Sequence, residues 1–454
     1  MASRTIAGFP LPPPPTMTVR PSALALTPLL LFLALFFGAG LYYTSQGDAM
    51  GFYQLRAPVA ILPALALGAW LAHRRGVAAS PTLLGGMGDA NVMLMCLIFL
   101  LAGAFATVSK AIGAVDAVVA LGLGALPPSL ILPGLFLVAS FVSLAIGTSM
   151  GTIAAVVPIA LGVADAAGLD RALVVGAVIG GAMFGDNLSV ISDTTIAATR
   201  SQGAEMRDKF RENFKIALPA AIATAALLAF QGDGAPVLAP GGASPWLVLP
   251  YVLVLILALI GLDVVVVLAI GLALSGVFGF IFAGDYTPVD LAGDIYAGFE
   301  SMVEVTLLSI LIGGLGALMK ASGGLDWLAR TIARFARGHT GRRSGEFSIA
   351  ALSAGTDVLT ANNTVAILIT GSLAKDIAER HGITPRRSAS VLDIFACVIQ
   401  GVLPYGAQIL LASSLAAVSP LALAGSVHYC WLLALAAIFF MILPARRTAA
   451  VPGN

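Results

Sequence analysis

Eight segments of this chain are apolar over roughly the twenty residues that a helix needs to cross the hydrocarbon core of a bilayer. They lie at 22–43, 54–73, 90–110, 215–231, 245–261, 264–284, 302–320 and 425–444. Only 10% of the 454 residues are charged, whereas about a quarter are charged in soluble proteins. No water-soluble fold of this size could bury so much apolar surface, so the chain is predicted to be an all-α polytopic membrane protein.

Two further regions, 128–200 and 346–418, are apolar but are interrupted by glycines and polar side chains. Backbone that leaves the helical conformation inside a bilayer is tolerated only where it lines a cavity or contacts protein. We therefore expect re-entrant hairpins near 128–165 and 346–374, and broken helices near 172–200 and 388–418.

The two halves of the chain resemble each other. GAFATVSKAIGAVD begins at Gly103 and GGLGALMKASGGLD begins at Gly313, an offset of 210, while TSMGT at 148–152 matches TANNT further on at an offset of 212. Ordered matches at nearly one offset indicate a duplication. The predicted organisation is a disordered cytoplasmic tail, a first repeat and a second repeat with about ten transmembrane helices in all, at 1–21, 22–231 and 245–444.

Charge indicates that the repeats are inverted, because lysine and arginine collect in cytoplasmic loops. The loop after the second predicted helix carries His73, Arg74 and Arg75, but its counterpart at 285–300 has four acids and no lysine or arginine. Two further loops, 200–215 in the first half and 320–343 in the second, are basic and are therefore expected to be cytoplasmic. We expect inverted-topology repeats, with both termini cytoplasmic and the protein in the plasma (inner) membrane.

The stretch GDNLSVISDTT concentrates oxygen-bearing side chains inside the first predicted broken helix. Gly185 is expected to permit the break, and the candidate ligands are Asp186, Asn187, Ser189, Ser192, Asp193, Thr194 and Thr195. Hard oxygens suit an alkali cation or a proton, and broken helices in inverted repeats are typical of secondary transporters. An acid at mid-membrane costs about 2.5–3.5 kcal/mol, which favours a functional role. The alternative for Asp193 is that it only caps a half-helix starting at Thr194.

Other candidate residues are expected to gather at the same site. Thr148 and Ser149 follow a glycine in the first hairpin, and Asn362, Asn363 and Thr364 occupy the matching position in the second. These polar groups could instead bond back to helix carbonyls. The second break contains Pro404, Tyr405 and Gly406, and weaker candidates are Asp357, Asp393 and Gln408. Asp357 and Asp393 could instead pair with Arg387 or cap a helix.

The second break lacks acids. Aligning Gly185 with Gly401, an offset of 216, places Val402 opposite Asp186 and Ile409 opposite Asp193. Burial and a neighbouring acid both favour the protonated form of a carboxyl group. We therefore expect proton binding to belong to the first half, and the second half to hold the cation with neutral oxygens. In this hypothesis the two acids bind either protons or one Na⁺, never both.

Three motifs, GTSMGT at 147–152, GDNLSVISDTT at 185–195 and LPYGAQ at 403–408, resemble the NhaC family of sodium/proton antiporters. The resemblance extends from about residue 20 to 444. It implies an ion-coupled exchanger of the inner membrane with the inverted-repeat fold of the ion transporter superfamily.

The favoured function is sodium or lithium exchange for protons at a midplane site. The alternative is an ion-coupled carrier of a small organic acid, amino acid or amine. An intramembrane aspartyl protease is disfavoured because Met183 and Phe184 precede Gly185, so the usual Gly-x-Gly-Asp run is absent. We expect no enzyme activity and no cofactor. The expected partners are membrane lipid, a monovalent cation and protons; the net charge of +1 does not favour nucleic acid, and a homodimer stays open.

Overall fold

The computed structural model of the protein describes residues 19–46, 54–117, 127–189, 192–232, 244–260, 262–337 and 341–443. Within these ranges every regular element is a helix and no strand occurs. Nine described helical segments are long and apolar enough to cross a membrane, or ten if one bent pair counts as a single span. The prediction of an all-α, multi-pass membrane protein is confirmed. Most of the predicted N-terminal tail, residues 1–18, lies outside the described residues.

The first half is built from twelve described elements. The first eleven are η1 (Ala23–Leu26), α1 (Thr27–Ser45), α3 (Ala57–Ala60), α4 (Leu62–Arg74), α5 (Ala79–Met87), α6 (Ala90–Ala111), η2 (Pro128–Leu130), α8 (Ile131–Ile146), α9 (Ser149–Ala167), α10 (Arg171–Leu188) and α11 (Asp193–Gln202). A long helix, α12 (Met206–Gln231), closes this half.

The second half repeats this order. Its elements are η3 (Pro245–Val248), α13 (Leu249–Leu259), α14 (Val264–Phe282), α15 (Pro288–Ser301), α16 (Val303–Ala321), α17 (Gly324–Arg337), α18 (Arg342–Thr360), α19 (Asn363–Arg380), α20 (Pro385–Val402), α21 (Ala407–Ala416), α22 (Pro420–Ser426) and α23 (His428–Ile442).

The helix boundaries of the two halves match at one constant spacing, whereas the sequence motifs match at several different spacings. Helices α10 and α20 begin and end 214 residues apart, and so do α11 and α21. The turn between α8 and α9 and the turn between α18 and α19 show the same spacing, because Gly147 (φ 77°) and Ala361 (φ 49°) each end the first helix in the left-handed conformation. The structural offset is therefore 214, not the 212 and 216 expected from the motifs. That the repeats are inverted across the membrane stays a prediction.

Each predicted broken crossing is a pair of helices. The two longest candidate spans, Arg171–Gln202 and Pro385–Ala416, are interrupted between α10 and α11 and between α20 and α21. The predicted hairpins are the pairs α8–α9 and α18–α19. Helix α9 is itself long and apolar enough to be a candidate span, so re-entry of the hairpins also stays a prediction.

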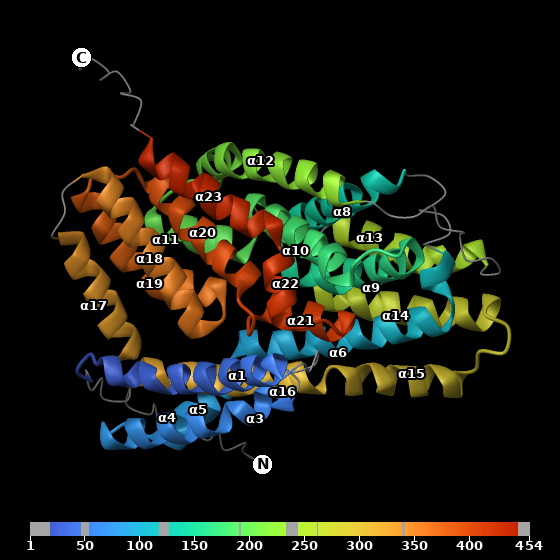
Figure 1. Cartoon of the computed structure of the whole chain (residues 1–454), viewed down its shortest axis with the longest axis horizontal. Helices are drawn as coiled ribbons and strands as arrows, with labels where there is room; N and C mark the ends of the chain where they lie inside the picture. Colours follow the sequence, from blue (N-terminus) through green and yellow to red (C-terminus); the bar gives the residue numbers. More distant parts are fainter. Residues whose placement is uncertain are drawn as a thin grey trace, which may run out of the picture.

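Helices α1, α4, α5 and α16 lie together along one side of the molecule, and α10, α20 and α23 lie in the layer across from them (Figure 1). Helix α10 is almost entirely buried because it packs against α8, α9, α12 and α20 to α23. The break at the end of α10 is therefore enclosed by both halves of the chain.

Gly185 does not break α10, which continues to Leu188. A Cβ atom at this position would lie 2.3 Å from the carbonyl oxygen of Ser140 in α8, and one at Gly181 would lie 2.2 Å from the oxygen of Phe136. Small residues four apart let two helix backbones approach closely. The predicted role of Gly185 as a helix breaker is wrong; it is a contact between α8 and α10 that brings the following residues to the break.

Candidate functional site

Several helix ends meet around one cavity of about 100 Å³. The C-terminal turn of α10, the N-termini of α9, α11 and α19, and two side chains of α20 and α21 enclose it. The polar lining residues are Thr148, Ser149, Asp186, Ser192, Asp193, Thr194, Asn362, Asn363, Thr364, Gln400 and Gln408. Residues from both predicted repeats are therefore brought together, as the sequence suggested for the two hairpin tips.

Asp186 is the most enclosed acid of this cavity, with only 4% of its surface exposed. Ser149 at the start of α9 donates a hydrogen bond to its Oδ2 at 2.8 Å, and Ser192 before α11 donates one to its Oδ1 at 2.5 Å. Hydrogen bonds to a charged group are shorter and stronger than neutral ones. The two hydroxyls thus fix the carboxylate between the first hairpin and the first break.

These hydroxyls belong to a directed chain of hydrogen bonds. Gln400 Nε2 donates to Gln408 Oε1 at 2.6 Å, and Gln408 Nε2 donates to Ser149 Oγ at 3.1 Å. On the other side, Thr194 Oγ1 lies 2.9 Å from Ser192 Oγ. While Asp186 is ionised, Ser192 donates its proton to the carboxylate, and Thr194 then donates to Ser192. Successive donors in a buried chain polarise one another, so all of these groups direct positive charge toward the carboxylate.

The second half contributes neutral groups to the cavity. At the offset of 214, Gln400 is the counterpart of Asp186 and Gln408 the counterpart of Thr194. The counterparts predicted from the motif, Val402 and Ile409, are each wrong by two residues. The expectation that the second half carries no acid at this position nevertheless agrees with the neutral Gln400.

Asn362 and Asn363 have separate positions at the start of α19. Asn362 is its N-cap residue and accepts a hydrogen bond from the N–H of Val365 at 3.0 Å, and Asn363 Oδ1 accepts one from the N–H of Thr364 at 2.9 Å. Both side-chain oxygens are thus partly engaged with the backbone while their residues line the cavity. The equivalent Thr148 is the N-cap of α9, and its side chain makes no capping bond.

Asp193 lies at the first position of α11 and is exposed. The cap of that helix is Ser192, so the alternative in which Asp193 only caps a half-helix starting at Thr194 is wrong. An acid in the first helical turn is favourable for the helix dipole, and Asp193 also lines the cavity.

Three predicted site residues near the first break do not line this cavity. Asn187, Ser189 and Thr195 are all buried, and the side chains of Asn187 and Thr195 contact another polar cluster. The carbonyl of Ser189 accepts the hydroxyl of Thr195 at 2.8 Å. The two residues that follow Ser189, 190 and 191, lie outside the described residues.

The second break comprises residues 403–406, between α20 and α21, and it contains Pro404, Tyr405 and Gly406 as predicted. Gly406 is the N-cap of α21. Tyr405 is buried and its hydroxyl donates to the carbonyl of Val358 in α18 at 2.6 Å. These residues therefore shape the break and do not supply ligands to the cavity of Asp186.

The polar cluster behind the first break centres on Asp393, which is completely buried. Its Oδ2 lies 2.7 Å from Lys209 Nζ and accepts hydrogen bonds from the side-chain amides of Asn187 and Asn213, each at 2.9 Å. The expected alternative partner of Asp393, Arg387, is not its partner. Lys209 and Asn213 were not predicted, although their spacing of four residues places them on one face of α12 with the buried Ile216.

The remaining candidates have other surroundings. Asp357 is completely buried in α18, and neither of its carboxyl oxygens has a hydrogen-bond partner among the described residues. Arg387 is buried and is held by Glu346, with Nη2–Oε2 at 2.9 Å, and by Glu212, with Nη1–Oε1 at 3.5 Å. The buried guanidinium of Arg387 is thus already paired with acids.

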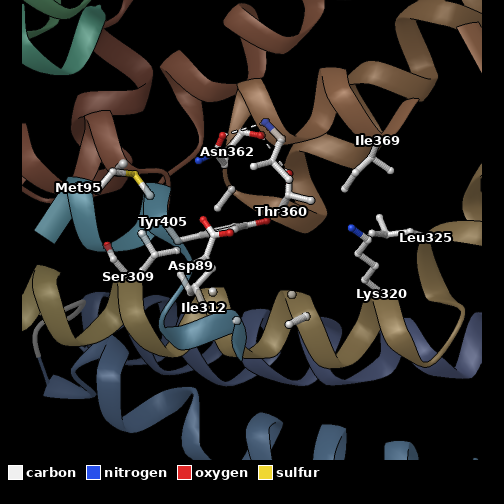
Figure 2. A pocket seen from close by; sticks show the side chains of 18 residues that line it. Asp89, Met95, Ser309, Ile312, Lys320, Leu325, Thr360, Asn362, Ile369 and Tyr405 are labelled. Carbon is white, nitrogen blue, oxygen red and sulfur yellow. Dashed lines mark hydrogen bonds between the residues drawn. The ribbon is translucent and has the colours of Figure 1, made fainter. Parts of the chain in front are cut away.

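A second cavity of about 170 Å³ adjoins the first and shares Met95, Ala361 and Asn362 with it. Figure 2 shows Lys320 projecting from α16 into this space, with Asp89 and Tyr405 further along the cavity. Most of the remaining lining is apolar or glycine. Because the two cavities are adjacent, a solute larger than a metal ion has room next to Asp186.

A sequence model described as the Na⁺/H⁺ antiporter family matches residues 82–232 and 239–444, which is more than half of the chain. The Na⁺/H⁺ antiporter NhaC of Bacillus subtilis is 26% identical over 355 residues, covering 70% of this chain and 76% of that protein.

The malate-2H⁺/Na⁺-lactate antiporter of the same organism is 29% identical over 254 residues, and this match covers 51% of the chain but only 53% of that relative. Among solved structures, the Alcanivorax borkumensis YdaH transporter aligns with 92% of this chain and 98% of its own, at 13% identity and a TM-score of 0.41.

Proposed function

The chain belongs to the Na⁺/H⁺ antiporter family, and from this premise we propose that it exchanges sodium or lithium ions for protons at Asp186. The observation that carries the proposal is the position of this carboxylate. Asp186 is 4% exposed, and its carboxylate accepts hydrogen bonds from two serine hydroxyls. It lines a cavity formed by helix ends from both halves. Such helix ends are where secondary transporters bind their coupling ions.

The ligands offered to a cation are hard oxygens of three kinds. The carboxylate of Asp186 supplies charge, and the hydroxyls of Ser149 and Ser192 supply neutral lone pairs. Asn362 and Asn363 of the second half supply amide oxygens to the same cavity. Oxygen ligands of this kind suit alkali cations and not soft metals.

Exchange follows from competition for one charge. A buried carboxylate is costly unless it is neutralised, and either a proton or a sodium ion neutralises Asp186. The two cannot bind the same oxygens together, so entry of the cation releases the proton. Asp193, exposed on the same cavity, is the second proton carrier in this proposal. If protons outnumber cations in a cycle, each net charge gains about 2.3 kcal/mol per 100 mV of membrane potential.

A second candidate function is an ion-coupled carrier of a small organic acid. The adjoining cavity of about 170 Å³, with Lys320 on its wall, favours it, and one relative is named as a malate and lactate antiporter. Arg387 is unsuited to hold a carboxylate because Glu346 and Glu212 already surround its guanidinium. The cation exchanger is preferred because Asp186 and the hydroxyls of Ser149 and Ser192 concentrate hard oxygens in the smaller cavity, whereas most of the larger cavity is lined by apolar residues and glycine.

Proteoliposomes with an internal pH dye test the proposal. We expect sodium-driven proton movement in the natural protein and its loss in Asp186→Asn, which removes the charge and keeps the size. Asp165→Asn is the matched control, because Asp165 is an exposed acid of the same half paired with Arg171. Proton movement that survives in Asp186→Asn would refute the assignment of the site.

A panel of organic acids and amines in the same vesicles separates the two candidate functions. Transport of an organic solute without sodium-dependent proton release would favour the second. We further propose that the protein resides in the plasma membrane with both termini cytoplasmic, which reporter fusions at each terminus would check; a terminal reporter active only outside the cytoplasm would contradict it.

A further inference from the structure

Lys209 has an unusual position for a lysine in the first turn of a helix. It is 1% exposed and its ammonium nitrogen is surrounded by three oxygens. It lies 2.7 Å from Asp393 Oδ2, 2.8 Å from the carbonyl oxygen of Asn187 and 2.6 Å from Thr195 Oγ1. A lysine ammonium has three donors, so all of its hydrogen-bonding capacity is used by this one cluster.

The three oxygens come from the features that form cation sites in transporters. Asn187 is in the last turn of α10, where carbonyls are left free by the helix end; Thr195 is in the first turn of α11 on the other side of the break; and Asp393 comes from α20 in the second half. Free carbonyls at a break, together with a carboxylate and a hydroxyl, bind small cations. Lys209, which donates to these three oxygens, lies on a fourth helix, α12.

Two further oxygens of the cluster have no hydrogen-bond partner within the described part of the chain. They are Oδ1 of Asp393 and Oδ1 of Asn213, and both are buried. A buried acceptor without a partner costs stability, and a bound cation would satisfy such acceptors. The cluster therefore contains more oxygens than the three donors of an ammonium can satisfy.

We propose that this cluster is a second cation site of the exchanger and that the ammonium of Lys209 permanently occupies it as a tethered cation. The inference rests on the proposed function, because it leaves Asp186 as the place where the exchangeable cation binds. Lys209 would hold the end of α10 through Asn187, adjacent to Asp186, and would limit the protein to one exchangeable cation. The ligand class for the emptied site is an alkali cation, Na⁺ or Li⁺.

Removing the ammonium tests the proposal. In Lys209→Met the site keeps its oxygens and loses its resident charge, so we expect a second bound sodium ion per chain, measured with ²²Na⁺ on purified protein. We also expect the melting temperature of this variant to rise with NaCl or LiCl well beyond the rise in the natural protein, and not to rise with choline chloride, because a ligand that binds only the folded state stabilises it.

Two controls make the result specific. Lys215→Met removes a lysine of the same helix that is 65% exposed, and it should bind sodium as the natural protein does. The double variant Lys209→Met with Asp393→Asn removes the carboxylate as well, and it should lose the second sodium ion. Lys209→Met should purify in sodium and aggregate in choline, since an unpaired buried aspartate is strongly destabilising.

Lys209→Met with the sodium stoichiometry of the natural protein, or with equal stabilisation by sodium and choline, would overturn the proposal. Failure of the variant to fold even in high sodium would also count against it, because the cation should replace the ammonium. The test separates the two proposals. Absence of sodium binding to the natural protein contradicts the proposed function. The number of sodium ions gained by Lys209→Met over the natural protein tests the second cation site, whatever the natural protein binds.

Discussion

Replacing Gly185 by alanine should destabilise the protein by forcing α8 and α10 apart. The added Cβ would lie 2.3 Å from the carbonyl oxygen of Ser140 and 2.6 Å from the amide nitrogen of Leu144. Both are backbone atoms, so no side chain can rotate away. The helices must separate by roughly 1 Å to restore an ordinary contact in a close-packed interior.

The magnitude follows from two opposing effects. Overpacking of a core costs about 1–3 kcal/mol, and the rigid backbone contact places Gly185→Ala at the upper end. Alanine gains up to about 1 kcal/mol over glycine in a helix interior. The expected net loss is therefore about 2 kcal/mol, and transport should fall as well because Asp186 is the next residue.

Thermal unfolding of the purified protein in detergent measures the effect. Gly38→Ala is the matched control, since Gly38 lies inside α1 and a Cβ there would contact nothing within 4 Å. The control should be as stable as the natural protein or more stable, while Gly185→Ala melts several degrees lower. Equal melting temperatures for the two variants would refute the close approach of α8 and α10.

Three further results are expected. Ala361→Gly should stabilise the protein by about 1 kcal/mol in the same unfolding assay, because φ of 49° is disfavoured for alanine; an unchanged or lower melting temperature would contradict this. Arg387→Met should cost roughly 1–3 kcal/mol, because the buried Glu346 loses two hydrogen bonds and keeps only Arg342 as a cationic partner. The exposed Arg171→Met should cost less than about 1 kcal/mol, and equal losses for the two variants would contradict the enclosed position of the Arg387 ion pair. Asn363→Ala should weaken the apparent sodium affinity in vesicle assays without moving the pH profile, and a moved profile would show that the second half takes part in proton binding.

The breaks and hairpins could be predicted from sequence because their signals are local. Glycine and polar residues interrupting an apolar stretch placed the breaks within a few residues, and the motifs at Thr148 and Asn362 placed the two tips opposite each other. Asp186 was identified because an acid in such surroundings is costly. These inferences need only the immediate neighbours along the chain.

The remaining features depend on contacts between distant segments. The sequence around Gly185 indicates a helix break, because the close contact of Gly185 with the backbone of Ser140 is not evident from the sequence. In the sequence, Lys209 is one of several basic residues at 200–215, and a count of charges does not show which of them turns toward the interior. Only the packing of α12 against the first break places that ammonium beside Asp393.

Proton release on sodium binding tests the central claim most directly. Purified protein in a weakly buffered solution is mixed with NaCl, and the released protons are measured against choline chloride at the same ionic strength. The account predicts release from the natural protein and from Asp165→Asn, and none from Asp186→Asn. Sodium binding without proton release, or undiminished release from Asp186→Asn, would contradict exchange by competition at this carboxylate.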